Sequence, residues 1–190
     1  MDRADVRLGW WERRSLERRR ALLAALVDRL APVRPQRVLD VGGGTGAFVA
    51  RVFPGLGAPC CVLDVRARRL RSGRRRRPDL AYVRGRAERL PFPSGSFDLI
   101  LAVMSLHHLA DPWAFLQEAR RVARDGAPLA IYEADPTATN GRRLAGLERW
   151  APGGGRSFSP PEALRHLSES AGWGVREIVR WPDRYLLLAA

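Results

Sequence analysis

Short apolar runs alternate with helical patterns along the chain. Five of these runs are bounded by turn residues and predict β-strands. They are 37–40, 59–64, 80–84, 97–103 and 127–134. The run Leu99–Val103 is nearly continuously apolar, which is typical of a strand buried on both faces. Strands that alternate with helices predict a mostly parallel α/β sheet.

The two ends of the chain differ from this alternation. Near the start, Glu12 to Leu30 carries an apolar stripe at helical spacing and predicts an amphipathic helix. Near the end, residues 175–181 and 185–188 flank Pro182-Asp183 and predict an antiparallel hairpin. A preceding helix, ending at Gly172, is predicted to start with a capping box at Ser159-Pro160-Pro161-Glu162.

A length of 190 residues fits a single domain, 1–190. The pattern predicts an α/β fold: a Rossmann-like, seven-stranded, mostly parallel sheet with helices on both faces and a C-terminal antiparallel hairpin. Residues 1–34 form a predicted N-terminal helical cap. The glycine-rich, irregular segment 135–158 is predicted to be a substrate lid.

Composition places the chain among ordinary globular proteins, with 46% apolar and 28% charged residues. No apolar run reaches the ~18 residues of a membrane span, and the N-terminus lacks the apolar core of a signal peptide. We therefore expect no membrane span and a cytoplasmic location. Cys60 and Cys61 are adjacent in a predicted strand, so we expect them to point to opposite faces as reduced, buried packing residues.

The net charge is +13, and all 33 basic residues are arginine. The densest cluster, Arg74 to Arg77, follows the predicted second helix. Arginines at a helix C-terminus interact favourably with the helix dipole, so the cluster can be a solvated helix end. The alternative is contact with a nucleic acid or an anionic substrate.

The stretch Asp40-Val41-Gly42-Gly43-Gly44-Thr45-Gly46 begins at the end of the first predicted strand. A glycine-rich turn here lets a ligand approach the backbone. The spacing also fits the dinucleotide pattern GxGxxG/A, and a bare turn is possible. Asp40 favours a ligand with an ammonium group over a pyrophosphate, because unit charges ~4 Å apart interact by roughly 1–4 kcal/mol at surface-like dielectrics.

Two segments resemble one family. The glycine stretch resembles motif I, (D/E)xGxGxG, of the class I S-adenosylmethionine-dependent methyltransferases. The segment Gly85 to Asp98 resembles the GDAExLPFxxxSFD segment of the small-molecule, type 11-like branch of that family. The resemblance implies S-adenosylmethionine as cofactor and a small-molecule methyl acceptor. The cofactor-binding residues that it implies are Asp40, Gly42, Gly43, Gly44, Gly46, Asp64, Val65, Arg86, Ala87, Glu88 and Met104.

Within that set the resemblance assigns particular roles. Asp64 ends the second predicted strand and matches the acid that binds the ribose hydroxyls, although it could instead cap the next helix. Val65 matches the residue that packs on adenine. Arg86 departs from the family, which often has Asp there, and an arginine cannot accept a bond from the adenine amino group. Adenine recognition is then expected to rest on the backbone of Ala87 and on stacking.

His107 and His108 follow the fourth predicted strand, where ligands gather in open α/β sheets. They are the candidate bases if the acceptor must lose a proton. The alternative is a structural role in which an imidazole bonds to the backbone. Three histidines and two adjacent cysteines give no spacing of metal ligands, so no metal site is expected.

Three functions compete at this stage. The first is methyl transfer to a small molecule, favoured by the LPF segment and the predicted lid. The second is an RNA or DNA methyltransferase that uses the arginine-rich surface, although the fourth strand ends in Met104-Ser105-Leu106-His107 and not in a (D/N/S)PP(F/Y/W) motif. The third is a non-catalytic, cofactor-binding partner subunit, a possibility that Arg86 leaves open.

Overall fold

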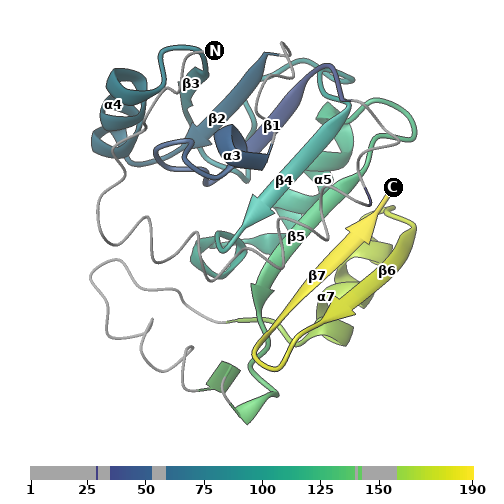
Figure 1. Ribbon diagram of the computed structural model, residues 1–190. Coiled ribbons are helices and arrows are strands. Elements are labelled where there is room, and N and C mark those ends of the chain that lie inside the picture. Colours follow the sequence, from purple (N-terminus) through teal and green to yellow (C-terminus); the bar gives the residue numbers. More distant parts are fainter. Residues whose placement is uncertain (1–28, 30–34, 53–58, 140, 143–157) are drawn as a thin grey trace.

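The computed structural model describes residues 29, 35–52, 59–139, 141–142 and 158–190. In this part of the chain, seven strands form one sheet in the order β3-β2-β1-β4-β5-β7-β6 (Figure 1). The strands are β1 Val38–Val41, β2 Cys60–Asp64, β3 Ala81–Arg84, β4 Leu99–Val103, β5 Leu129–Ala134, β6 Val175–Arg180 and β7 Arg184–Ala189. The first five are parallel, and β7 pairs antiparallel with both β5 and β6. The predicted fold is confirmed.

The helices follow the strands as the alternation predicted. They are α3 Val49–Val52, α4 Ala67–Arg76, the 3₁₀ turn η2 Leu106–His108, α5 Pro112–Val122 and α7 Pro161–Ser170. At α5, the side chain of Asp111 accepts a hydrogen bond from the N–H of Ala114 and Pro112 occupies the first turn. Both residues stabilise a helix start, since they satisfy or remove donors that lack a partner inside the helix.

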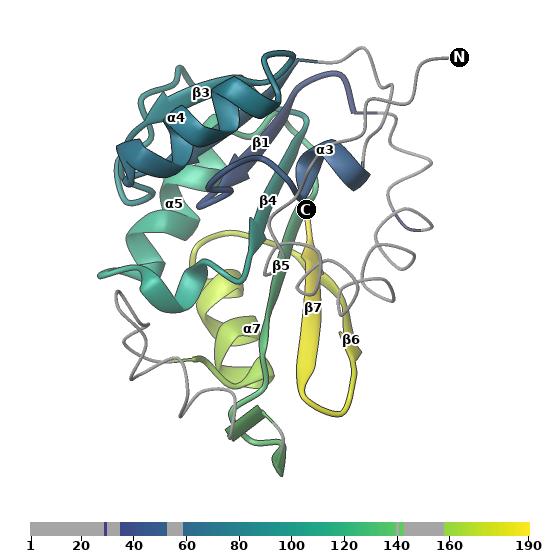
Figure 2. The ribbon, with the colours of Figure 1, turned by 60° about the vertical axis from the view of Figure 1, so that its left-hand side comes forward.

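The two faces of the sheet carry separate cores. Helices α5 and α7 pack on one face through residues such as Phe115 and Leu164, and the indole N–H of Trp173 donates to the carbonyl of Leu116 at 3.0 Å. Val49 of α3 and Leu70 of α4 belong to the core of the other face. Figure 2 shows α5 and α7 on one side of the sheet and α3 on the other.

Cys60 and Cys61 are buried free thiols, one in each core, as the alternation of strand side chains requires. Burial, and secondarily the charge of Asp40, raises the pKa of both thiols to about 11. They are protonated packing residues at neutral pH.

The start of α7 differs from the expectation. The predicted capping box is wrong: Pro160 is the N-cap, and no side chain caps the helix. The chain at Ser159 is held differently, because its carbonyl accepts a hydrogen bond from the hydroxyl of Tyr185 at 2.9 Å. Glu162 instead pairs with Arg165 and Arg180.

Other differences concern element ends and coverage. The arginine cluster does not follow α4 but forms its last turn, with Arg77 as C-cap. The helix predicted at 12–30 lies outside the described residues except for Arg29, whose guanidinium pairs with Glu177 of β6 at 2.7 Å. Most of the predicted lid, 135–158, also lies outside them.

Candidate active site

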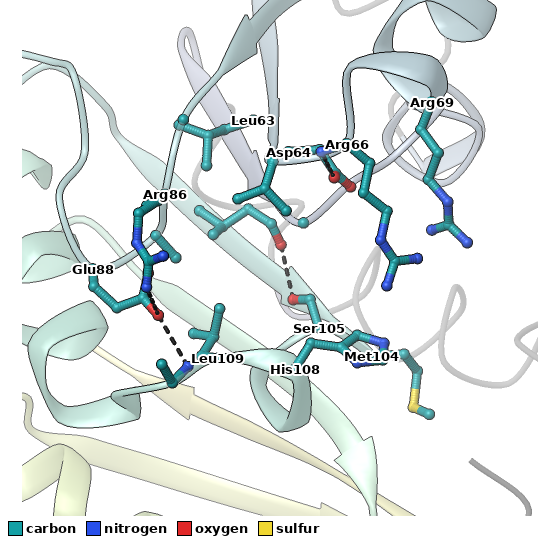
Figure 3. Close-up of a pocket in the computed structure, with 16 residues that line it drawn as sticks. Leu63, Asp64, Arg66, Arg69, Arg86, Glu88, Met104, Ser105, His108 and Leu109 are labelled. Atoms are coloured by element: carbon teal, nitrogen blue, oxygen red, sulfur yellow. Dashed lines mark hydrogen bonds and ion pairs between the residues drawn. The ribbon is translucent and has the colours of Figure 1, made fainter. Parts of the chain in front are cut away.

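The parallel strands end at one edge of the sheet, and a cavity of about 260 Å³ opens there (Figure 3). This volume is near the lower end of the roughly 300–1,000 Å³ that ligand sites occupy. The residues lining it follow β1, β2, β3 and β4. They are Val41, Gly42, Leu63, Asp64, Val65, Arg66, Arg69, Gly85, Arg86, Ala87, Glu88, Met104, Ser105, His108, Leu109 and Ala110.

The glycine loop after β1 is held from two sides. The N–H of Gly42 donates to the carbonyl of Leu63 at 2.7 Å, and the hydroxyl of Tyr82 donates to the carbonyl of Thr45 at 3.1 Å. Gly42 lines the cavity with a φ of +74°, a conformation that L side chains rarely adopt. Gly43, Gly44 and Gly46 are not among the residues that line the cavity, and their contact with a cofactor stays a prediction. A Cβ on Gly46 would lie 2.7 Å from the side chain of Leu80, so this position has no room for a side chain.

Asp40 lies beneath this loop. It is 1% exposed and does not line the cavity. A Cβ on Gly43 would fall 2.3 Å from its Oδ2 atom, so the absence of a side chain at Gly43 makes room for the carboxylate. Asp40 thus lies against the loop, and contact between Asp40 and a ligand's ammonium group stays a prediction.

Asp64 ends β2 and lines the cavity with little exposure. Its Oδ1 accepts the backbone N–H of Arg66, the residue before α4, at 2.7 Å. Its Oδ2 accepts no hydrogen bond from the residues that the structure describes and lies 3.8 Å from where a Cβ of Gly44 would be. One oxygen therefore supports the start of α4 and the other is available to a ligand. Val65 beside it is 53% exposed and offers an apolar surface.

The wall opposite α4 comes from the segment after β3 (Figure 3). Ala87 is buried there. Glu88 accepts the N–H of Ala110 at 3.0 Å and pairs with the guanidinium of Arg86 at 3.4 Å. The Arg86 side chain is 66% exposed, so the pair lies at the rim of the cavity and the charge of Arg86 is partly balanced by Glu88.

The end of β4 brings two residues to the cavity floor. Met104 has a φ of +51°, and its N–H donates to the carbonyl of Tyr132 at 2.8 Å. A positive φ is uncommon for a residue with a side chain and often marks a functional turn. Ser105, which the sequence did not single out, donates its hydroxyl to the carbonyl of Val41 at 2.8 Å and joins the ends of β1 and β4.

The two histidines of η2 have different surroundings. His108 lines the cavity, and its pKa is lowered to about 4, first by partial burial and then by its neighbours His107, Arg66 and Arg69. His107 does not line the cavity and is buried, with Nδ1 2.7 Å from Oε2 of Glu133. The alternative role that the sequence left open, an imidazole bonded to the backbone, is not what His107 adopts: its partner is a side-chain carboxylate.

Comparisons with known proteins place the chain. A model of the methyltransferase domain matches residues 39–131. Demethylmenaquinone methyltransferase of Renibacterium salmoninarum is 35% identical over 163 residues, which cover 84% of this chain and 65% of that protein. The chain belongs to the class I S-adenosylmethionine-dependent methyltransferases. A second relative, the ubiquinone/menaquinone biosynthesis C-methyltransferase UbiE of Coxiella burnetii, is 35% identical over 106 residues, 52% of this chain and 42% of its own.

The chain spans about two thirds of the length, 65%, of the first of these methyltransferases. Solved structures agree on the fold. The S-adenosylmethionine-dependent methyltransferase of Mesorhizobium loti has a TM-score of 0.72 at 18% identity, covering 87% of this chain and 97% of its own. The [4+2]-cyclase SpnF has a TM-score of 0.74 at 20% identity, covering 97% and 83%. Since a methyltransferase and a cyclase share it, the fold alone does not fix the reaction.

The cavity of this methyltransferase domain fits the cofactor of its family. Asp64 offers a carboxylate oxygen to a pair of hydroxyl groups, as a ribose requires. Leu63, Ala87 and Leu109 supply apolar walls for a planar base. The described residues contain no cluster of three or more His, Cys, Asp or Glu side chains able to hold a metal ion. No helix among them is long and apolar enough to cross a membrane.

Polar residues in or beside the site that escaped prediction are Arg66, Arg69, Ser105 and Glu133. Arg66 and Arg69 lie at the start of α4, and their guanidinium groups reach over the same side of the cavity (Figure 3). Their position directly after Asp64 was a usable signal, although arginine is too common in this chain to stand out. Glu133 gave one faint signal, since it is the carboxylate inside an otherwise apolar strand.

Proposed function

We propose that this protein transfers a methyl group from S-adenosylmethionine to a small-molecule acceptor. The observation that carries the proposal is the cavity at the carboxyl edge of the sheet, with Asp64 at one wall and Met104, Ser105 and His108 at the floor. A ribose-binding carboxylate and a candidate acceptor site are thereby within one cavity. When bound, S-adenosylmethionine supplies a methyl group activated by a positively charged sulfur.

We assign the cofactor contacts as follows. Asp64 binds the ribose hydroxyls with its free oxygen, and Val65, Ala87 and the neighbouring apolar wall receive the adenine. Gly42 lets the cofactor approach the backbone, and Asp40 supports the loop and provides negative charge nearby. Glu88 and Met104 border the same space, and Arg86 lies at its rim.

The protein's part in the reaction is mainly alignment and exclusion of water. Methyl transfer is an in-line displacement that needs no covalent intermediate on the protein. An acceptor that must lose a proton needs a base, and His107 and His108 are the candidates that neighbour the cavity. With a pKa of about 4, His108 is neutral at physiological pH and a weak proton acceptor, which favours His107.

The names of the relatives support an acceptor class. Two of them are named for menaquinone or ubiquinone biosynthesis and act, by those names, on quinone precursors. We propose a small aromatic or quinol-like acceptor for this chain as well. The cytoplasm is the proposed location, consistent with the absence of a membrane-spanning helix in the described residues.

Two alternatives keep some support. The six exposed arginines of α4 favour an RNA substrate, because guanidinium groups pair well with phosphates. Arg86, which cannot accept a hydrogen bond from adenine, keeps the non-catalytic partner subunit in view.

Calorimetry tests the cofactor assignment. S-adenosylmethionine and its demethylated product should bind, and NAD should not, because Asp40 disfavours a pyrophosphate. NAD binding more tightly than S-adenosylmethionine would overturn the assignment. Incubation of cell extract with methyl-labelled cofactor then identifies the acceptor: label in small metabolites supports the proposal, and label only in RNA favours the alternative.

A further inference from the structure

A buried pair of titratable side chains lies beside the cavity without being part of its wall. The side chains of His107 and Glu133 are 2% and 1% exposed, and Nδ1 of His107 lies 2.7 Å from Oε2 of Glu133. The second carboxylate oxygen, Oε1, accepts the backbone N–H of Leu106 at 2.7 Å. Glu133 therefore fixes both the imidazole and the backbone of η2.

This geometry selects one form of the imidazole. An ionised carboxylate only accepts hydrogen bonds, so the proton between the two side chains belongs to Nδ1. A neutral imidazole then carries its lone pair on Nε2. The Nε2 atom of His107 is buried and has no hydrogen-bond partner among the residues that the structure describes. A buried polar atom without a partner calls for an explanation in a native protein.

The imidazole of His107 lies among aromatic rings, which suits an aromatic ligand nearby. The ring of Phe158 stacks on the His107 ring with centroids 4.1 Å apart and planes 23° apart. His108, which lines the cavity, contacts the same imidazole at a centroid distance of 4.1 Å. Tyr185 on β7 lies opposite Glu133 in the sheet register. Burial raises the pKa of the Tyr185 hydroxyl, and the charges of Glu133 and Asp135 raise it further. Tyr185 is therefore a neutral neighbour of the pair.

We propose that Glu133 and His107 form a proton-accepting pair, and that the methyl acceptor is an acidic hydroxyl compound, a phenol or enol, whose O–H donates to Nε2 of His107. This inference rests on the proposed function. Glu133 is the positioning residue and His107 the catalytic one. Because Nε2 is buried, the acceptor reaches it when side chains packed around the imidazole move aside.

The proton balance is simple. The O–H bond of the acceptor breaks, its proton joins the lone pair of Nε2, and the oxygen keeps the electron pair. The resulting imidazolium lies next to the Glu133 carboxylate, whose negative charge stabilises it in the low dielectric of the core. The electron pair left on the acceptor, on oxygen or on the conjugated carbon, is the nucleophile for the methyl group. A base oriented by a hydrogen-bonded carboxylate is a recurring arrangement in general-base catalysis.

Nitrogen NMR of protein labelled with ¹⁵N-histidine tests the first half of the proposal. In the wild type, Nδ1 of His107 should be protonated and Nε2 should give the signal of a bare nitrogen. Glu133→Gln should abolish this fixed tautomer, because an amide can donate as well as accept. The matched control is Glu118→Gln, since Glu118 also accepts a backbone N–H, from Leu90 at 2.7 Å, but contacts no histidine in the described part of the chain. A wild type with its lone pair on Nδ1 would overturn the proposal.

Two probes test the second half on protein loaded with S-adenosylhomocysteine. 2-Naphthol carries an acidic O–H, whereas 2-methoxynaphthalene has the same rings and no donor. 2-Naphthol should bind the wild type and shift the Nε2 signal of His107. The loss of one hydrogen bond predicts about tenfold weaker binding in two cases: 2-methoxynaphthalene to the wild type, and 2-naphthol to Glu133→Gln. Equal affinity for both probes, or an Nε2 signal that does not shift when 2-naphthol is added, would contradict the inference.

The two proposals can fail separately. If S-adenosylmethionine does not bind the wild type, the proposed function fails, whereas the tautomer of His107 is still measured in the unliganded protein. Glu133→Gln should retain wild-type affinity for S-adenosylmethionine, because Glu133 does not line the cavity. If Glu133→Gln folds poorly, the proposal is still tested by the tautomer of His107 and by the binding of the two probes, both measured on the wild type.

Discussion

Gly42 lies directly against Ser105, so that a Cβ atom on Gly42 would fall 2.4 Å from the Cβ of Ser105. The ends of β1 and β4 meet at this point, and the hydroxyl of Ser105 bonds to the carbonyl of Val41 beside it. The glycine is required both by this contact and by its φ of +74°. The close approach therefore lets two strands converge at the cavity.

Gly42→Ala should destabilise the fold and weaken cofactor binding. The control is Gly126→Ala, because Gly126 has a φ of +75° but no atom within 4 Å of its would-be Cβ. Backbone strain should lower the free energy of unfolding of both variants by roughly 1–2 kcal/mol. The clash should lower that of Gly42→Ala by about 1–3 kcal/mol more. Urea unfolding measures the difference. Equal losses would mean that Ser105 moves away without cost.

Asp64→Asn should weaken binding of S-adenosylmethionine by about 1.5–3 kcal/mol, the scale of hydrogen bonds to a charged group. The amide can still accept the N–H of Arg66, so the start of α4 and the stability should change little. Calorimetry and thermal unfolding separate the two effects. Asp79→Asn, an exposed change outside the cavity, is the control. An unchanged dissociation constant for Asp64→Asn would leave Asp64 with only its role at the helix start.

His108 should make the fold less stable in acid. Its pKa is about 4 in the folded chain and 6.5 for an unperturbed imidazole. Below pH 6.5 the unfolded chain therefore binds a proton that the folded chain does not, and stability falls as the pH drops from about 6.5 to about 4.

His108→Gln should remove this loss of stability. When the pH is lowered from 7.5 to 4.5, the urea midpoint of the variant should therefore rise relative to that of the wild type. His166→Gln is the control, because His166 lies exposed on α7. The same pH dependence in wild type and His108→Gln would show that His108 is not the responsible group.

The arginines of α4 should be dispensable for methylation of a small acceptor. The triple change of Arg68, Arg71 and Arg75 to Gln removes exposed charge outside the cavity lining. If these side chains contact RNA phosphates, the slope of log affinity against log salt should flatten by about 2 for a single strand. Changing the scattered, exposed Arg37, Arg51 and Arg176 to Gln is the control for net charge. Loss of methyl transfer with intact cofactor binding, in the α4 variant alone, would make RNA the leading substrate.

The parallel strands were predictable because each signal is local. The runs that became β1 to β5 are short, apolar and bounded by turn residues, and parallel strands joined by helices leave few possible topologies. Asp64 and His108 could be placed at the site by the same reasoning. Asp64 is the last residue of β2, and His108 lies shortly after the end of β4. The hairpin at Pro182-Asp183 followed from its turn residues.

What the sequence did not reveal depends on contacts between distant residues. Glu133 meets His107 across 26 positions, and nothing near Glu133 in the chain indicates this partner. Ser159 looked like a helix cap, but the hydroxyl of Tyr185 holds its carbonyl from a neighbouring strand. The packing of Gly43 against the carboxylate of Asp40 was equally invisible in the sequence. Local patterns cannot express such tertiary contacts.

The hydrogen bond from the hydroxyl of Tyr82 to the carbonyl of Thr45 affects the energetics of ligand binding. Together with the bond from Gly42 to Leu63, it anchors the glycine loop to β2 and β3. A loop that is already ordered loses little conformational entropy when a nucleoside arrives. The amide hydrogen of Gly42 should accordingly exchange slowly with solvent in the ligand-free protein, and Tyr82→Phe should speed that exchange while lowering the association rate of the cofactor.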